Sequence, residues 1–124
     1  MMWKTSLIAL ALASLALAPG TVSGQTGRAT LVMIDLDHCP TCLAWKRDVQ
    51  PGYVKSDIHA RLPLEIINIK HLTNSRFFDL PTPGVFPTFY IVGDDGDVLA
   101  TIEGYLSGDF FWGYLDANLR RLNL

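Results

Sequence analysis

The fold is decided by the stretch Leu31-Val-Met-Ile-Asp-Leu-Asp-His-Cys-Pro-Thr-Cys42. Its first six residues are apolar apart from Asp35, a pattern typical of a central strand that is buried on both faces. Cys39 and Cys42 follow, and they are the only cysteines in the chain. The residue after Cys39 is a proline, which is favoured in the first turn of a helix. We therefore expect a strand that leads into a closely spaced dithiol at a helix N-terminus.

Residues 1–24 have the pattern of a secretory signal peptide. Lys4 gives a short positive start, and an apolar run of small residues covers positions 7–18. That run is too short to span a bilayer, and no stop-transfer pattern follows it. We expect cleavage near Gly24 and a periplasmic location. An uncleaved N-terminal anchor is the alternative.

The mature domain would comprise residues 25–124, which is the length of one domain. Loss of Lys4 moves the formal charge from −2 to −3. A mildly acidic domain without a basic run argues against nucleic acid as a partner. A single cysteine pair also differs from structural disulfide scaffolds, which usually carry several bridges. We expect a monomer.

The hydrophobic pattern predicts an α/β domain with the order β-α-β, a short helical segment, then β-β-α. The expected strands cover residues 31–36, 64–69, 88–92 and 98–103. A helical crossover between the first two strands implies that they are parallel. Asp94-Asp95-Gly96-Asp97 has hairpin chemistry, so the last two strands should be antiparallel.

The helices are predicted from capping residues and spacing. The first helix starts after Cys39 and is kinked or ended by Pro51-Gly52. A short helix is expected within residues 73–80, and Ser107 or Asp109 should cap the last one. The apolar residues at helical spacing in the last helix should face the sheet. These are Phe111, Leu115, Leu119 and Leu122.

The dithiol suits thiol–disulfide exchange. Unpaired N–H groups and the helix dipole favour a thiolate on Cys39. Cysteines in such positions have pKa values of ~3.5–7.5, against ~8.5 for a free thiol. We expect Cys39 to be the exposed nucleophile and Cys42 the buried resolving thiol. An imidazolium at His38 would stabilise the thiolate further, unless His38 is only a solvated loop residue.

The same cysteine spacing fits other chemistries: half of a zinc site, a copper-chaperone loop or a static disulfide. A structural zinc site needs four ligands. Beyond the cysteines the chain offers only His38, His59 and His71, without zinc-finger spacing. We therefore expect no metal, and no cofactor besides a redox-active Cys39–Cys42 disulfide.

Phe86-Pro87-Thr88 directly precedes the third expected strand. Proline is accepted at the first residue of a strand. Only ~5–6% of X-Pro bonds in folded proteins are cis, so a cis bond is suggested here only in combination with the dithiol. It would turn the backbone of Phe86 toward the dithiol, where its N–H and C=O could pair with an extended substrate. An ordinary trans proline is the alternative.

This order of elements and motifs resembles the thioredoxin superfamily over nearly all of residues 28–124. Three segments, residues 39–49, 86–92 and 103–113, are similar to the small SoxS-type periplasmic thioredoxins of bacterial sulfur-oxidation (Sox) systems. The resemblance implies a thioredoxin fold, with a central mixed four-stranded sheet flanked by helices.

The resemblance also implies a site and partners. Cys39 would attack, Cys42 would resolve, and Pro87 would be the cis-proline. We assign modulating positions to His38, Pro40 and Thr41, and substrate-binding positions to Phe86 and Thr88. The expected partners are periplasmic protein thiols and disulfides, a thiol-bearing sulfur-oxidation carrier that is kept reduced, and a membrane thiol–disulfide electron donor. A disulfide oxidase or isomerase of exported proteins and a copper chaperone remain the alternatives.

Two positions depart from thioredoxins. A buried Asp usually lies six residues before the first cysteine, where this chain has Met33, so the proton acceptor for Cys42 is unassigned. The residue before the first cysteine is commonly Trp, and here it is His38. The redox potential therefore cannot be transferred; known couples range from ~−270 mV for thioredoxin to ~−120 mV for the oxidant DsbA.

The aromatic group Phe110, Phe111, Trp112 and Tyr114 forms either a partner surface or part of the core. At helical spacing, these side chains cannot all face the sheet. We expect Phe111 to be buried and Trp112 to be the most exposed of the group.

Overall fold

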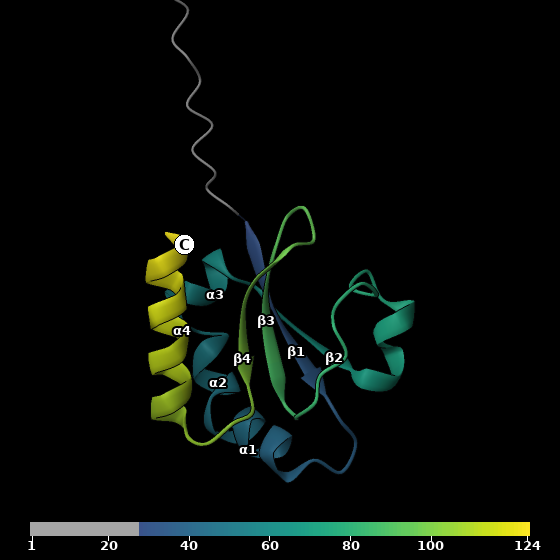
Figure 1. The fold of residues 1–124 in the computed structure, drawn as a ribbon. Coiled ribbons are helices and arrows are strands. Elements are labelled where there is room, and N and C mark those ends of the chain that lie inside the picture. The colour runs from purple at the N-terminus through teal and green to yellow at the C-terminus, as the bar shows by residue number, and fades with distance from the viewer. Residues whose placement is uncertain (1–27) are drawn as a thin grey trace, which may run out of the picture.

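The computed structural model describes residues 28–124, in which helices flank a four-stranded sheet (Figure 1). The expected signal peptide and its cleavage near Gly24 lie outside the described residues. In chain order the elements are β1 (Ala29–Asp35), α1 (Pro40–Asp48), α2 (Gln50–Tyr53), α3 (Asp57–Arg61), β2 (Leu64–Asn68), the 3₁₀ helix η1 (Ile69–Asn74), β3 (Thr88–Gly93), β4 (Val98–Glu103) and α4 (Gly108–Leu122). Among these helices, none has the length and apolar character needed to cross a membrane.

Strand β1 lies inside the sheet, whose order is β2-β1-β3-β4. It pairs in parallel with β2 and antiparallel with β3, where Met33 lies opposite Phe89. Strand β4 pairs antiparallel with β3, and Thr88 lies opposite Glu103. The expected mixed sheet, with a parallel first pair and an antiparallel last pair, is confirmed.

The continuous apolar run of β1 contributes side chains to two hydrophobic clusters, because successive side chains of a strand point to opposite faces of the sheet. Leu31 and Met33 belong to the cluster that packs under α1, α2 and α4. Val32 and Ile34 belong to a second cluster beneath residues 69–80. All four side chains are fully buried, which explains why β1 lacks the polar alternation of a one-sided strand.

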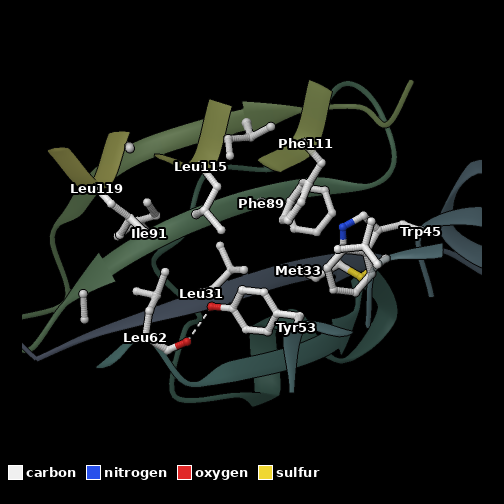
Figure 2. Packing of buried hydrophobic residues seen from close by; sticks show 14 of the residues in the cluster. Leu31, Met33, Trp45, Tyr53, Leu62, Phe89, Ile91, Phe111, Leu115 and Leu119 are labelled. Carbon is white, nitrogen blue, oxygen red and sulfur yellow. Dashed lines mark hydrogen bonds between the residues drawn. The ribbon is translucent and has the colours of Figure 1, made fainter. Parts of the chain in front are cut away.

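Three aromatic rings hold α1 and α4 on the sheet (Figure 2). The ring centroid of Trp45 lies 5.0 Å from that of Phe89 and 5.4 Å from that of Phe111. Phe89 and Phe111 are 4.9 Å apart. Tilted and edge-on arrangements at these distances are favourable for aromatic pairs. Helix α1, which carries the dithiol, is thereby packed against the sheet through Trp45.

The segment after α1 is kinked rather than ended. Val49 separates α1 from α2, and Pro51 lies in the first turn of α2. Tyr53 is fully buried and its hydroxyl donates to the carbonyl of Leu62 at 2.5 Å, as Figure 2 shows. This bond ties α2 to the chain that enters β2.

The expected helix within residues 73–80 was wrong. A 3₁₀ helix occupies Ile69–Asn74 instead, directly after β2. It begins early because the Asn68 side chain accepts from the backbone N–H of Lys70 at 3.1 Å, and it ends because Ser75 is extended. Residues 75–80 form turns, from which Phe77 and Leu80 pack against the sheet.

Helix α4 starts at the expected cap. The Ser107 hydroxyl accepts from the N–H of Phe110, so Ser107 rather than Asp109 is the capping residue. Phe111, Leu115 and Leu119 are buried against the sheet, as expected. Leu122, the last of the four expected core residues, is partly buried.

Candidate functional site

Cys39 and Cys42 are joined by a disulfide at the start of α1. Cys39 is the N-cap residue, and Pro40 follows at the first helical position, where its missing N–H leaves no bond unmade. Cys39 is 6% exposed and Cys42 1%. The expectation that Cys39 is exposed was therefore wrong for this disulfide form, although Cys39 is the more accessible of the two residues.

The N-terminus of α1 provides a backbone hydrogen-bond donor to Cys39. The backbone N–H of Cys42 donates to Sγ of Cys39 across 3.1 Å. In the reduced protein this N–H and the positive end of the helix dipole would stabilise a negative charge on the same sulfur. The arrangement suits Cys39 to act as a thiolate nucleophile.

The peptide bond between Phe86 and Pro87 is cis. Its loop is connected to the dithiol by Thr41, whose hydroxyl donates to the carbonyl oxygen of Phe86 at 2.8 Å and lies 3.4 Å from Sγ of Cys39. On the other side of the loop, the N–H of Gly104 donates to the carbonyl of Pro87 at 2.7 Å. The two motifs that the sequence singled out are therefore brought together.

The same loop contains the two positions expected to bind substrate. The Phe86 carbonyl oxygen accepts one hydrogen bond, from Thr41. Its second lone pair and the N–H of Phe86 are left for an extended ligand. The Thr88 side chain is 1% exposed and donates to the carbonyl of Val85 at 2.8 Å. Thr88 therefore supports the loop from within, and its buried side chain is not accessible for direct contact with a ligand.

An acidic residue braces the turn that precedes the dithiol. Asp37 accepts hydrogen bonds from Lys70 at 2.8 Å and from Asn68 at 2.9 Å. The Lys70 ammonium, through this bond and its charge, holds the pKa of the exposed Asp37 carboxyl below its ordinary value. The next residue, His38, has a positive φ of 55° and is exposed. The two hydrogen bonds to Asp37 therefore stabilise the turn that contains His38 and leads to Cys39.

Met33 is fully buried within the core cluster, so no acid occupies the position that thioredoxins give to a buried Asp. Asp35, two residues further along β1 and on the same face, is instead paired with Lys46 at 2.5 Å. Lys46 lies four residues after Cys42 and therefore on the same side of α1. The side chains of Asp35 and Lys46 are 14% and 31% exposed. A carboxylate of β1 thus contacts α1, but it comes from Asp35 rather than from position 33.

The Asp35–Lys46 pair was not among the expectations from the sequence. The spacing could have found the pair, because Met33 and Asp35 share a strand face and Cys42 and Lys46 share a helix face. The hydrogen bond between Thr41 and Phe86 could not be predicted from residue spacing in this way, since 45 residues separate the two partners.

The aromatic group of α4 is arranged differently from the expectation. Trp112 is partly buried and its ring stacks on that of Tyr53, with centroids 5.8 Å apart. The prediction that Trp112 is the exposed member was wrong. Phe110 and Tyr114 are instead the exposed members, at 53% and 58%. They are one helical turn apart and face away from the sheet.

Within residues 28–124, no three Cys, His, Asp or Glu side chains gather closely enough to hold a metal ion. His59 lies in α3, where its ring packs edge-on against Tyr53 with the centroids 5.7 Å apart. His71 lies in η1 and is exposed. Of the three histidines, only His38 adjoins the dithiol.

No protein-family model matches this sequence, and no curated protein matches it. Solved structures do match. The periplasmic thioredoxin SoxS from Paracoccus pantotrophus, in its reduced form, has a TM-score of 0.59 and 22% identity; the match covers 76% of this chain and 98% of that one. The reduced C-terminal domain of DsbD from Neisseria meningitidis has a TM-score of 0.50 and 18% identity, covering 75% of this chain and 83% of that one. The chain therefore has a thioredoxin fold and resembles SoxS in structure.

Proposed function

We propose that this protein is a thiol–disulfide oxidoreductase that works in the periplasm through Cys39 and Cys42. The observation that carries the proposal is the position of the disulfide, at the N-terminus of α1 and linked through Thr41 to the cis-Pro87 loop. A helix N-terminus favours the thiolate, and the loop offers backbone groups to an extended substrate. Together they suit the site to thiol–disulfide exchange with a protein substrate.

The reaction runs in two exchanges. The Cys39 thiolate attacks one sulfur of a substrate disulfide, a mixed disulfide forms, and the other substrate sulfur leaves as a thiolate that takes a proton from water. Cys42, as a thiolate, then attacks Sγ of Cys39, which re-forms the internal disulfide and releases the second substrate thiolate. The two electrons come from the dithiol and end on the substrate. A donor dithiol must reduce Cys39–Cys42 before the next cycle.

Within this scheme, the modulating residues have distinct contacts. Thr41 adds a hydroxyl 3.4 Å from the sulfur proposed to attack. Pro40 occupies the first helical turn, and His38 is the exposed residue directly before Cys39. Phe86 offers its backbone to the substrate, and Thr88 supports the loop from below.

For the direction, we propose reduction of a thiol-bearing sulfur-oxidation carrier protein, with electrons supplied by a membrane thiol–disulfide donor. Support comes from the structural match to a protein described as the periplasmic thioredoxin SoxS. The reduction potential tests the direction. A value near thioredoxin's ~−270 mV supports a reductant, and a value near ~−120 mV would make the protein an oxidant of exported proteins.

Trapping tests the exchange itself. Cys42→Ser lacks the resolving thiol, so it should accumulate a mixed disulfide with its partner that dithiothreitol releases. Cys39→Ser, the matched control, lacks the attacking thiol and should trap nothing. If Cys42→Ser, expressed with its signal in a periplasm, forms no covalent adduct, the exchange proposal fails. Tight copper(I) binding by the reduced protein without disulfide exchange would favour a copper chaperone.

The export proposal has its own test. The chain is expected to lose residues 1–24, so the protein recovered from the periplasmic fraction should begin at Gln25. Intact mass measurement of that fraction checks this. Recovery of the full-length chain in the membrane fraction would support an uncleaved anchor instead.

A further inference from the structure

The outer face of α4 carries two exposed aromatic rings that nothing in the described part of the chain covers. Phe110 and Tyr114 stack with a centroid distance of 6.4 Å and an interplanar angle of 25°. We call this pair the aromatic ridge. Leu106, in the loop before α4, is 78% exposed. Exposed apolar side chains are ordinary when scattered singly, but a contiguous group is typical of an interaction site.

Two hollows adjoin the ridge, since Phe110 and Tyr114 line both of them. The first, of about 360 Å³, is bounded by the end of β4, the loop 104–106 and the ridge. The second, of about 500 Å³, is shallower and runs along α4 past Gly113 and Ala117. Volumes of this size accept one or two large side chains. The ridge and both hollows together form a groove that an extended segment could follow.

The groove is continuous with the proposed exchange site. Gly104, in the wall of the first hollow, donates its N–H to the carbonyl of Pro87 at 2.7 Å. The loop is also tied to the dithiol helix, since the Tyr105 hydroxyl donates to Asp48 of α1 at 3.1 Å. The first hollow therefore adjoins the loop that is proposed to hold the substrate, within reach of residues that flank a reactive cysteine bound there.

The charges of the groove have one sign. Glu103 lines the first hollow and Asp109 the second, and they are the only charged residues in the two linings. Both are exposed, and in the described part of the chain neither forms an ion pair. Two unpaired carboxylates beside an apolar groove favour a segment that carries Lys or Arg.

We infer that this groove recognises the substrate protein, through an aromatic or large aliphatic side chain flanked by Lys or Arg, close in sequence to the reactive cysteine. The inference rests on the proposed exchange function and deepens it. It assigns Phe110, Tyr114, Glu103 and Asp109 to substrate selection, away from the sulfur chemistry. A second copy of this chain is the competing occupant of the groove.

The test uses short peptides that each hold one cysteine as a mixed disulfide with thionitrobenzoate, whose release is coloured. One peptide set carries Phe and Lys at successive distances from the cysteine; matched sets replace Phe with Ser or Lys with Glu. The reduced protein is mixed with each peptide, and with glutathione disulfide as a small substrate without side chains for the groove. The readout is the ratio of the peptide rate constant to the glutathione rate constant.

We expect the Phe–Lys peptide at the best spacing to react about tenfold faster than its Ser counterpart, because burial of one large apolar side chain suffices for that factor. In the double variant Phe110→Ser, Tyr114→Ser this advantage should disappear. Phe78→Ser removes a similarly exposed phenylalanine, 60% accessible, from residues 75–80, which pack on the other face of the sheet through Phe77 and Leu80, and it should retain the advantage. Glu103→Lys with Asp109→Lys should make the Glu peptide react faster than the Lys peptide, an effect that salt reduces.

The outcomes separate the groove from the exchange function. If all peptides react at one rate while glutathione disulfide is reduced, the groove inference is wrong and the exchange function stands. If glutathione disulfide and the peptides are all inert, both fail. If sedimentation shows a wild-type dimer that the ridge variant dissociates, and peptides show no preference, the groove binds a second copy and substrate selection is overturned.

Discussion

The hydroxyl of Thr41 donates a hydrogen bond to the carbonyl oxygen of Phe86 across 2.8 Å, joining the dithiol helix to the cis-proline loop. The same hydroxyl lies 3.4 Å from Sγ of Cys39. One side chain thus contacts both the sulfur proposed to attack and the backbone proposed to hold the substrate.

Thr41→Val keeps the shape of the side chain and removes the hydroxyl. Loss of one net hydrogen bond, about 0.5–1.5 kcal/mol, should slow exchange with peptide disulfides about threefold to tenfold. In the reduced protein the hydroxyl can turn its single hydrogen from the Phe86 carbonyl to the Cys39 thiolate. Thr41→Val removes that donor, so alkylation of Cys39 should also require a higher pH. Stopped-flow exchange and an iodoacetamide pH profile measure the two effects.

Two variants serve as controls for Thr41→Val. Thr41→Ser retains the hydroxyl and should restore most of the rate. Thr73→Val makes the same change at an exposed position of η1 and should have no effect. An unchanged rate and pH profile in Thr41→Val would show that the bond contributes nothing to exchange.

The brace at Asp37 makes stability depend on pH in a defined direction. Its folded-state pKa lies below the ordinary 3.8, chiefly because of the hydrogen bond from Lys70. The stabilisation is therefore fully present above the unfolded pKa and is lost as the pH falls through the lowered folded pKa. Asp37→Asn should be less stable than wild type at neutral pH, and the difference should shrink as the pH falls through the lowered folded-state pKa of Asp37.

Urea unfolding of wild type and Asp37→Asn across this pH range measures the Asp37 contribution. Lys70→Met added to Asp37→Asn should cause little further loss at neutral pH, since the partner is already gone. A difference between wild type and Asp37→Asn that is the same at every pH would contradict an ionic brace.

Tyr53→Phe tests the buried bond between α2 and the chain entering β2. The hydroxyl is removed and the Leu62 carbonyl loses a buried donor at 2.5 Å. A buried acceptor left without its partner costs about 1–3 kcal/mol, so the free energy of unfolding should fall by that amount. Tyr114→Phe, at an exposed tyrosine, should change it by less than about 0.5 kcal/mol. Equal losses in the two variants would contradict the role of the bond.

Much of the fold was predictable because its signals are local. Each of these signals acts within a few residues, and the element that it predicted was confirmed. They are the apolar run of β1, the Pro after Cys39, the Asp-Gly turn and the Ser107 cap. The helix expected in residues 73–80 failed because Asn68 starts a 3₁₀ helix at once after β2. Side-chain capping by the last strand residue outweighed the weak helical pattern further on.

The site was predictable in its residue types and less so in their contacts. The dithiol and the cis-proline bond lie where the sequence motifs placed them. The burial of Cys39 and the inward turn of Trp112 depend on how α1, α2 and α4 pack together. Trp112 illustrates the reason: the ring of Tyr53, 59 residues earlier, gives it a stacking partner that no helical periodicity reveals.

The most direct test of the central claim is a single-turnover reaction between the fully reduced protein and the disulfides of insulin. Acid quenching and mass measurement give the thiol state of both proteins over time. We predict that one insulin disulfide is reduced for each protein molecule that converts Cys39 and Cys42 to a disulfide, and that Cys39→Ser reduces none. Reduction at the same rate by Cys39→Ser, or a reduced wild-type protein that transfers no electrons to insulin, would contradict a function based on this dithiol.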